Sequence, residues 1–293
     1  MTLLSRIRLS AKFALRLIVP LVCGGIVVFV YVTAVLTSRG QHLEDRALSA
    51  ATMPRNVPLL LRLVSVPDLL IALIVIVLIA VMRKRLDLAV LALTIIGTSN
   101  VATQVLKYGL LWRPDLAGMM TENTFPSGHT TAYVSVFLAA IVVVPPVIRS
   151  VLSVPAAILS SGTAIALLGF GWHRLSDIVG AIAVVTFIAT LGAAVIPRWR
   201  SAHETPRRPL LESLCTQILA VVILIALVLS AIAFALALFT RHGADFFMLA
   251  GTETIATAAI FAAFLTFTVY FSRLTDGQGE LLSANKKKLA ASV

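Results

Sequence analysis

The residues of this chain that could carry chemistry fall into three short polar strings set between apolar segments. They occupy residues 107–114 (KYGLLWRP), 125–130 (FPSGHT) and 171–177 (GWHRLSD). Ionisable groups beside long apolar segments are costly to keep, so each such group calls for a functional account. The residue types in each string indicate what that function is.

The first two strings have the composition of an anion-binding site. Lys107 offers an ammonium and Arg113 a planar guanidinium that suits phosphate oxygens. Ser127 can cap a helix and Gly128 allows close backbone approach, so N–H groups at that helix start could bind an anion. His129 would then stand beside the anion as a proton donor. The alternatives are an interfacial Lys and Arg, and a capped helix start with an interfacial His.

The third string has the composition of an activated histidine. His173 and Asp177 are four residues apart and share a face on a helical turn. A carboxylate that accepts from one imidazole nitrogen fixes the tautomer and leaves the other nitrogen nucleophilic. The alternative is a local side-chain contact at a helix start.

Taken in order, the three strings resemble the motifs of the type-2 phosphatidic-acid phosphatases, which share a fold with vanadium haloperoxidases. The family pattern is K-x6-R-P, P-S-G-H and S-R-x5-H-x3-D; this chain has K-x5-R-P, P-S-G-H and H-x3-D. The resemblance covers about residues 67–196 and the preceding apolar segment. It implies a membrane lipid phosphate or diphosphate phosphatase that uses a phosphohistidine intermediate, with a polyprenyl (di)phosphate or a phosphatidyl lipid as substrate.

The resemblance also implies a role for each site residue. His173 would attack phosphorus, Asp177 would orient it, and His129 would protonate the leaving oxygen. The phosphoryl oxygens would be held by Lys107, Arg113, Ser127 and the backbone of Gly128. No metal and no other cofactor is implied.

Two departures from the family pattern affect this interpretation. The interval from Lys107 to Arg113 is one residue short, and Ala166-Leu167 stand where the family has Ser-Arg. Arg174, the basic residue next to the site in sequence, is our candidate substitute for the missing arginine. Two other functions therefore stay open: a phosphotransferase of cell-envelope lipid or glycolipid metabolism, and a non-catalytic lipid-phosphate-binding or transport-associated membrane protein.

The composition places these strings in a membrane protein. Of the 293 residues 59% are hydrophobic and 13% charged, with a mean hydropathy of +0.99, whereas soluble domains carry about 25% charged residues. Apolar segments long enough to cross a bilayer predict an all-α polytopic bundle of about eight transmembrane helices. The predicted spans are 13–37, 67–82, 86–106, 130–148, 151–170, 178–196, 215–240 and 249–271.

The distribution of Lys and Arg predicts the orientation. With both termini cytoplasmic, twice as many of them fall inside as outside, as the positive-inside rule requires. All three strings then lie on the extracytoplasmic face of a multi-pass cell-membrane protein, in keeping with a bacterial inner membrane. The net charge of +11 reflects these loops, so the expected partners are a lipid-linked phosphate substrate and membrane lipids, with no nucleic acid.

Residues 1–200 are expected to form a six-helix catalytic core, and residues 201–293 two additional helices and a basic tail. The two additional helices could recruit a protein partner. Residues 38–66 predict either an interfacial helix or a plain loop. The polar tail after Arg273 is expected to be disordered or attached to anionic lipid.

Overall fold

The computed structural model describes residues 3–52, 59–62, 64–118, 122–196, 209–240 and 243–290, with side chains from residue 14 to residue 274 apart from that of residue 60. Within these ranges the chain is helical and has no strand, which confirms the all-α prediction. The predicted boundary between residues 200 and 201 lies outside the described residues.

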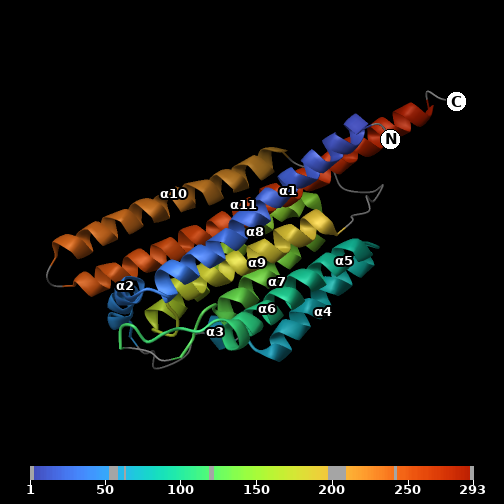
Figure 1. The fold of residues 1–293 in the computed structure, drawn as a ribbon. Coiled ribbons are helices and arrows are strands. Elements are labelled where there is room, and N and C mark those ends of the chain that lie inside the picture. Colours follow the sequence, from blue (N-terminus) through green and yellow to red (C-terminus); the bar gives the residue numbers. More distant parts are fainter. Residues whose placement is uncertain are drawn as a thin grey trace.

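The helices follow one another in the order shown in Figure 1. They are α1 (Leu3–Val30), η1 (Tyr31–Val35), α2 (Ser38–Ser49), α3 (Leu59–Arg62), α4 (Val66–Met82), α5 (Leu86–Leu93), η2 (Thr94–Thr98), α6 (Ser99–Val105), η3 (Leu106–Leu110), α7 (Gly128–Val143), α8 (Pro146–Gly169), α9 (Leu175–Val195), α10 (Pro209–Phe239) and α11 (Ala244–Ala290). The three η elements are π-helical turns that continue the α-helices around them.

The apolar character of these helices is that of a membrane protein. Six helical segments in the described part of the chain are long and apolar enough to cross a bilayer: 14–35, 86–110, 146–169, 175–195, 209–239 and 244–274. Two shorter apolar helices, α4 and α7, accompany them. Many large apolar side chains of α1, α4 and α10 are exposed, as expected where lipid covers the surface.

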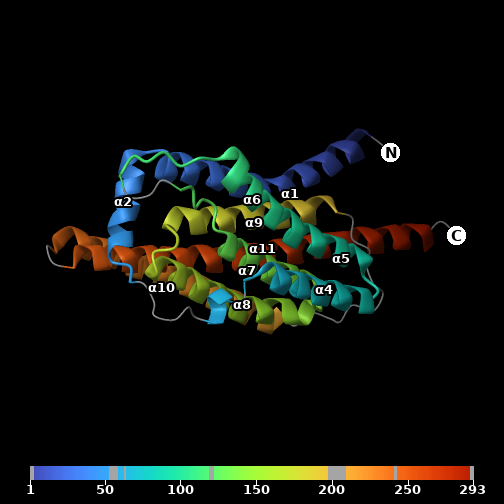
Figure 2. The same cartoon turned by 90° about the horizontal axis from the view of Figure 1, so that it is seen from below.

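The long helices run side by side in one bundle (Figures 1 and 2). α1 begins and α11 finishes at the same end, called here the termini end. α2 lies across the opposite end, called the α2 end, and is steeply inclined to the bundle in Figure 2. α9 packs against α1, α7 and α11, and α10 packs on the outside of α11. The α2 end is where the loops that carry the three polar strings gather.

Several predicted boundaries differ from the observed ones. The predicted span 130–148 is two elements, because α7 finishes at Val143 and Pro146 begins α8 in the first-turn position that proline favours. Within the predicted segment 38–66, residues 38–49 form the helix α2 and are not a plain loop; the interfacial position of this helix stays a prediction. The expectation of a disordered tail is wrong, because α11 remains helical to Ala290; its attachment to lipid stays a prediction.

Candidate functional site

The first polar string begins in the π-helical turn η3, which follows the helix α6. Lys107 lies in η3, and the chain becomes extended at Leu111. The Asn123 side-chain amide donates to the carbonyl oxygens of Lys107 and Leu111, at 3.0 Å each. Asn123 thus folds the loop after Arg113 back onto η3 and brings the first string to the start of α7. On an α-helix, an interval one residue shorter would rotate Lys107 about the helix axis relative to Arg113. Lys107 lies in a π-helical turn, whose hydrogen bonds span five residues and not four, so the rotation expected for an α-helix does not apply here.

The second string forms the capped start of α7. Ser127 is the N-cap, and its hydroxyl oxygen accepts from the backbone N–H of Thr130 at 3.4 Å. The backbone N–H of Ser127 donates to the carbonyl oxygen of Asp177 at 2.9 Å, which joins the starts of α7 and α9. Phe125 is fully buried against Gly180, where a Cβ atom would lie 2.3 Å from the ring. Position 180 must therefore be a glycine for the Phe125 ring to pack there and hold the turn that precedes Ser127.

The third string is a tight turn between α8 and α9. Gly171 has a φ of 68°, a left-handed conformation that favours glycine. The backbone N–H groups of Trp172 and His173 donate to the carbonyl oxygen of Leu167 at 3.0 and 3.3 Å. These bonds close the end of α8 and hold His173 just before α9 begins. Leu167, at the position of the family's arginine, is fully buried.

Asp177 is the buried centre of the site. Its Oδ2 atom lies 3.2 Å from Nδ1 of His173, as the sequence predicted, and accepts from the backbone N–H of Arg174 at 2.9 Å and from the Thr124 hydroxyl at 2.7 Å. Its Oδ1 atom accepts from Nη2 of Arg113 at 2.8 Å. An ionised carboxylate can only accept hydrogen bonds, so Nδ1 of His173 carries the proton that it donates to Asp177. In the neutral imidazole, Nε2 then keeps its lone pair and can act as a nucleophile.

Arg113 has hydrogen-bonding capacity to spare although it is buried. Its side chain is 1% exposed. Nη2 also lies 3.3 Å from the Ser176 hydroxyl, and Nη1 is 3.7 Å from Oε2 of Glu44. Neither Nε nor Nη1 has a hydrogen-bond partner among the described residues. A buried donor without an acceptor costs about 1–3 kcal/mol, so these two atoms retain the capacity to donate to a ligand.

Glu44, on α2, belongs to the site and was missed by the sequence analysis. Its carboxylate accepts from the backbone N–H of Ser176 at 2.7 Å and from the Ser176 hydroxyl at 3.0 Å. Burial and the nearby charge of Asp177 raise the pKa of Glu44 to about 7, against the opposing effects of Ser176 and Arg113. The adjacent carboxylates Glu44 and Asp45 were the available signal, but their hydrogen-bond partners Ser176 and Arg174 lie more than 120 residues away.

Arg174 is held by the second of these carboxylates. Its Nε and Nη2 atoms donate to Oδ1 of Asp45 at 3.0 and 2.6 Å, and its side chain is 3% exposed. This pair fastens α2 onto the start of α9. The geometry thus gives Arg174 a structural partner, and its expected role as the substitute phosphate-binding arginine stays a prediction.

The remaining predicted residues lie around this centre without contacting Asp177. His129 is half-buried in the first turn of α7, with its ring centroid 6.2 Å from that of Trp172. It is close enough to His173 and Lys107 to interact with both electrostatically. The Lys107 Nζ atom lies 5.3 Å from the centroid of the neighbouring Tyr108 ring. Gly128 faces the side-chain amide of Gln104 with room for a Cβ atom.

The site offers no metal-binding cluster in the part of the chain that the structure describes, since no group of three or more His, Cys, Asp or Glu residues there could hold an ion. What it offers chemically is a carboxylate-oriented imidazole, a second histidine nearby and a buried guanidinium. No family model, curated protein or solved structure matches the chain.

Proposed function

We propose that this chain is an integral-membrane lipid phosphate or diphosphate phosphatase that works through a phosphohistidine at His173. One observation carries the proposal. Asp177 joins an imidazole, His173, to a buried guanidinium, Arg113, in which two donor atoms make no hydrogen bond within the described residues. A nucleophile oriented by a carboxylate, beside a guanidinium with donor atoms left over, is an arrangement that suits phosphoryl transfer.

The chemistry follows from these positions in two steps. In the first, Nε2 of His173 forms a bond to phosphorus, the bond from phosphorus to the leaving oxygen breaks, and His129 gives that oxygen a proton. In the second, a water oxygen attacks phosphorus, the phosphorus–nitrogen bond breaks, and His129 takes the proton from the water. Arg113 and Lys107 offset the charge on the phosphoryl oxygens, with the capped start of α7 beside them.

The membrane arrangement is part of the same proposal. The two shorter apolar helices, α4 and α7, cross the bilayer together with the six longer ones, which makes eight spans. The excess of Lys and Arg on the termini end puts both termini in the cytoplasm, and a bacterial inner membrane suits that orientation. The α2 end is then extracytoplasmic, and lipid substrates such as polyprenyl (di)phosphates or phosphatidyl lipids reach it from the outer leaflet.

A second function is favoured by one specific observation. Leu167 is fully buried where the family has an arginine, and Arg174 is engaged by Asp45. A site with one phosphate-binding arginine fewer could bind a lipid phosphate without turning it over. In that case the chain would be a lipid-phosphate-binding protein, and the pair of His173 and Asp177 would serve only to position the turn before α9.

The test is release of inorganic phosphate from a panel of lipid phosphates and diphosphates, in detergent with a chelator present. The intact protein is compared with His173→Ala and with His42→Ala, a control at an exposed histidine of α2. Release by the intact protein and the control, but not by His173→Ala, supports the phosphatase. Binding without release in all three supports the second function. Transfer of the phosphoryl group to an added lipid or sugar hydroxyl, rather than to water, would indicate a phosphotransferase.

A further inference from the structure

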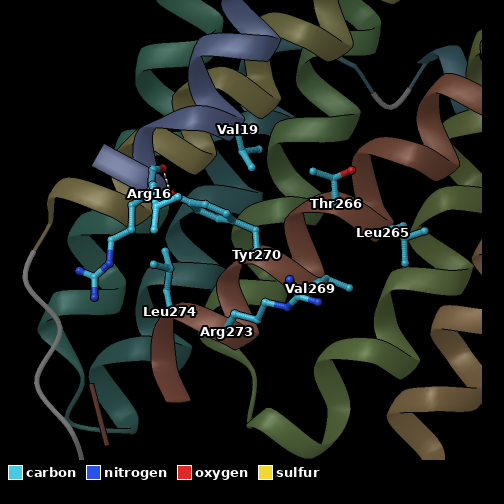
Figure 3. A pocket seen from close by; sticks show the side chains of 9 residues that line it. Arg16, Val19, Leu265, Thr266, Val269, Tyr270, Arg273 and Leu274 are labelled. Carbon is cyan, nitrogen blue, oxygen red and sulfur yellow. Dashed lines mark hydrogen bonds between the residues drawn. The ribbon is translucent and has the colours of Figure 1, made fainter. Parts of the chain in front are cut away.

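A groove between α1 and α11 near the termini end is not used by the proposed phosphatase site. It has a volume of about 670 Å³ and opens between the middle of α1 and the middle of α11. Figure 3 shows it from close by. The proposed active site lies at the opposite end of the bundle, so it does not explain the presence of this groove.

The walls of the groove are apolar, and hydrogen bonds join the helices around it. Leu15 and Val19 line it from α1, and Leu265 and Val269 from α11. Tyr270 connects the helices around it, because its hydroxyl lies 2.7 Å from the carbonyl oxygen of Arg16 on α1 and 3.2 Å from that of Thr190 on α9. The groove is therefore part of the packed structure, with a hydrogen-bonded tyrosine at its base.

Two cations border the groove near the ends of the apolar segments that carry them. Arg16 is the third residue of the apolar segment 14–35, and Arg273 is the last but one of the segment 244–274. In Figure 3 their guanidinium groups lie on either side of Tyr270. Arginines this close to the ends of apolar segments place their charges at the boundary between hydrocarbon and headgroups.

We propose that this groove binds a phospholipid with an anionic headgroup from the cytoplasmic leaflet. One acyl chain follows the apolar walls, and the anionic headgroup lies at the mouth of the groove, where Arg16 and Arg273 supply positive charge on either side. Basic pockets between transmembrane helices on the cytoplasmic side suit such lipids, and guanidinium donors suit their phosphate oxygens. The inference uses none of the active-site residues and so does not depend on the phosphatase activity; only the choice of leaflet rests on the proposed orientation.

The test measures lipid binding to the purified full chain in detergent. Short-chain phosphatidylglycerol is titrated against phosphatidylcholine of the same chain length, with the dissociation constant read from the rise in Tm. We expect phosphatidylglycerol to bind more tightly. The double variant Arg16→Gln/Arg273→Gln should weaken its binding roughly tenfold or more. Arg273→Gln alone, at an exposed position, gives a smaller loss in the same direction and does not threaten the fold. Arg39→Gln, exposed on α2 at the other end, should bind as the unaltered chain does.

A second variant separates a groove from a general attraction of positive charge to anionic lipid. Val269→Trp fills the space while both arginines remain. It should abolish the preference for phosphatidylglycerol and leave the unfolding transition cooperative. Retention of the preference in Val269→Trp, or an equal loss in Arg39→Gln, would overturn the proposal, because either result assigns the effect to surface charge. Equal binding of the two lipids by the unaltered protein would overturn it as well.

Discussion

Replacement of Asp177 by asparagine changes the site most selectively, because it keeps the shape of the side chain and removes its charge. In the structure the carboxylate accepts from Arg113, Thr124, the Arg174 backbone and His173. An asparagine has a single accepting oxygen, and its NH₂ group meets donors. Either Arg113 or His173 therefore loses its hydrogen bond to this side chain.

Two separate magnitudes follow from this geometry. Asp177 is fully buried and Arg113 is 1% exposed, so breaking this buried ion pair should lower the free energy of unfolding by about 3–5 kcal/mol. If the asparagine NH₂ faces His173, the imidazole must change tautomer and present a protonated Nε2 to phosphorus. In serine proteases, where an aspartate orients the catalytic histidine, the same substitution lowers kcat about 10⁴-fold. We expect a loss of that order in phosphate release.

The assay compares turnover per folded molecule and Tm in detergent for the unaltered chain, Asp177→Asn and a matched control, Asp87→Asn. Asp87 is also a buried aspartate paired with an arginine, Arg85, at 2.8 Å, but it lies at the termini end. The control should lose comparable stability and keep its turnover. Turnover of Asp177→Asn within about tenfold of the unaltered chain, or an equal loss in Asp87→Asn, would refute the reasoning that the carboxylate orients a nucleophile.

Three further predictions concern the packing around the site. The pKa of Glu44, about 7 in the folded protein, lies above its unfolded value, so its protonated form stabilises the fold fully below about pH 4.5. This contribution, on the order of 3 kcal/mol, is lost as the pH rises to about 7; Glu44→Gln should remove that part of the pH dependence of Tm. Gly180→Ala should cost about 1–3 kcal/mol of stability, because the added methyl meets the Phe125 ring, and it should reduce phosphate release by displacing the turn before Ser127. Arg174→Ala and Asp45→Asn should each lower Tm by stranding a buried charge, with little change in the KM for a lipid phosphate.

Each of these three predictions has a control variant or a result that would contradict it. An unchanged slope of Tm against pH in Glu44→Gln would contradict the first. Gly25→Ala on α1, where nothing lies within 4 Å of the added methyl, is the control for Gly180→Ala and should leave both stability and turnover intact. For the third, the double variant Arg174→Ala/Asp45→Asn should recover part of the lost Tm. A KM at least tenfold higher in Arg174→Ala, with a normal KM in Asp45→Asn, would instead establish Arg174 as a phosphate ligand.

The helices were predictable because hydropathy is a local property of the chain. The predicted span 67–82 differs by one residue from α4 (Val66–Met82), and the predicted span 178–196 lies almost wholly within α9 (Leu175–Val195). The errors occur where another effect acts. The turn at Pro145 interrupts an apolar run that continues to Ile148, and the polar residues after Arg273 extend α11 although hydropathy marks the end of the span.

The site was predictable only as far as its contacts are local. The pair of His173 and Asp177 follows from their spacing of four, and the Ser127 cap from its place before α7. The ties of Arg113 to Asp177 and of Glu44 to Ser176 join residues 64 and 132 positions apart. Such pairings depend on how the helices pack at the α2 end, which no local pattern in the sequence specifies.

The most direct test of the central claim is to trap the phosphoryl-enzyme. The protein is mixed with a lipid phosphate labelled in its phosphoryl group, quenched in alkali within a single turnover, and digested for peptide mass spectrometry. The account predicts an acid-labile, alkali-stable phosphoryl group on His173 that is absent from His173→Ala and appears before phosphate is released. Phosphate release by the unaltered protein with no label on His173, or with equal release by His173→Ala, would contradict it.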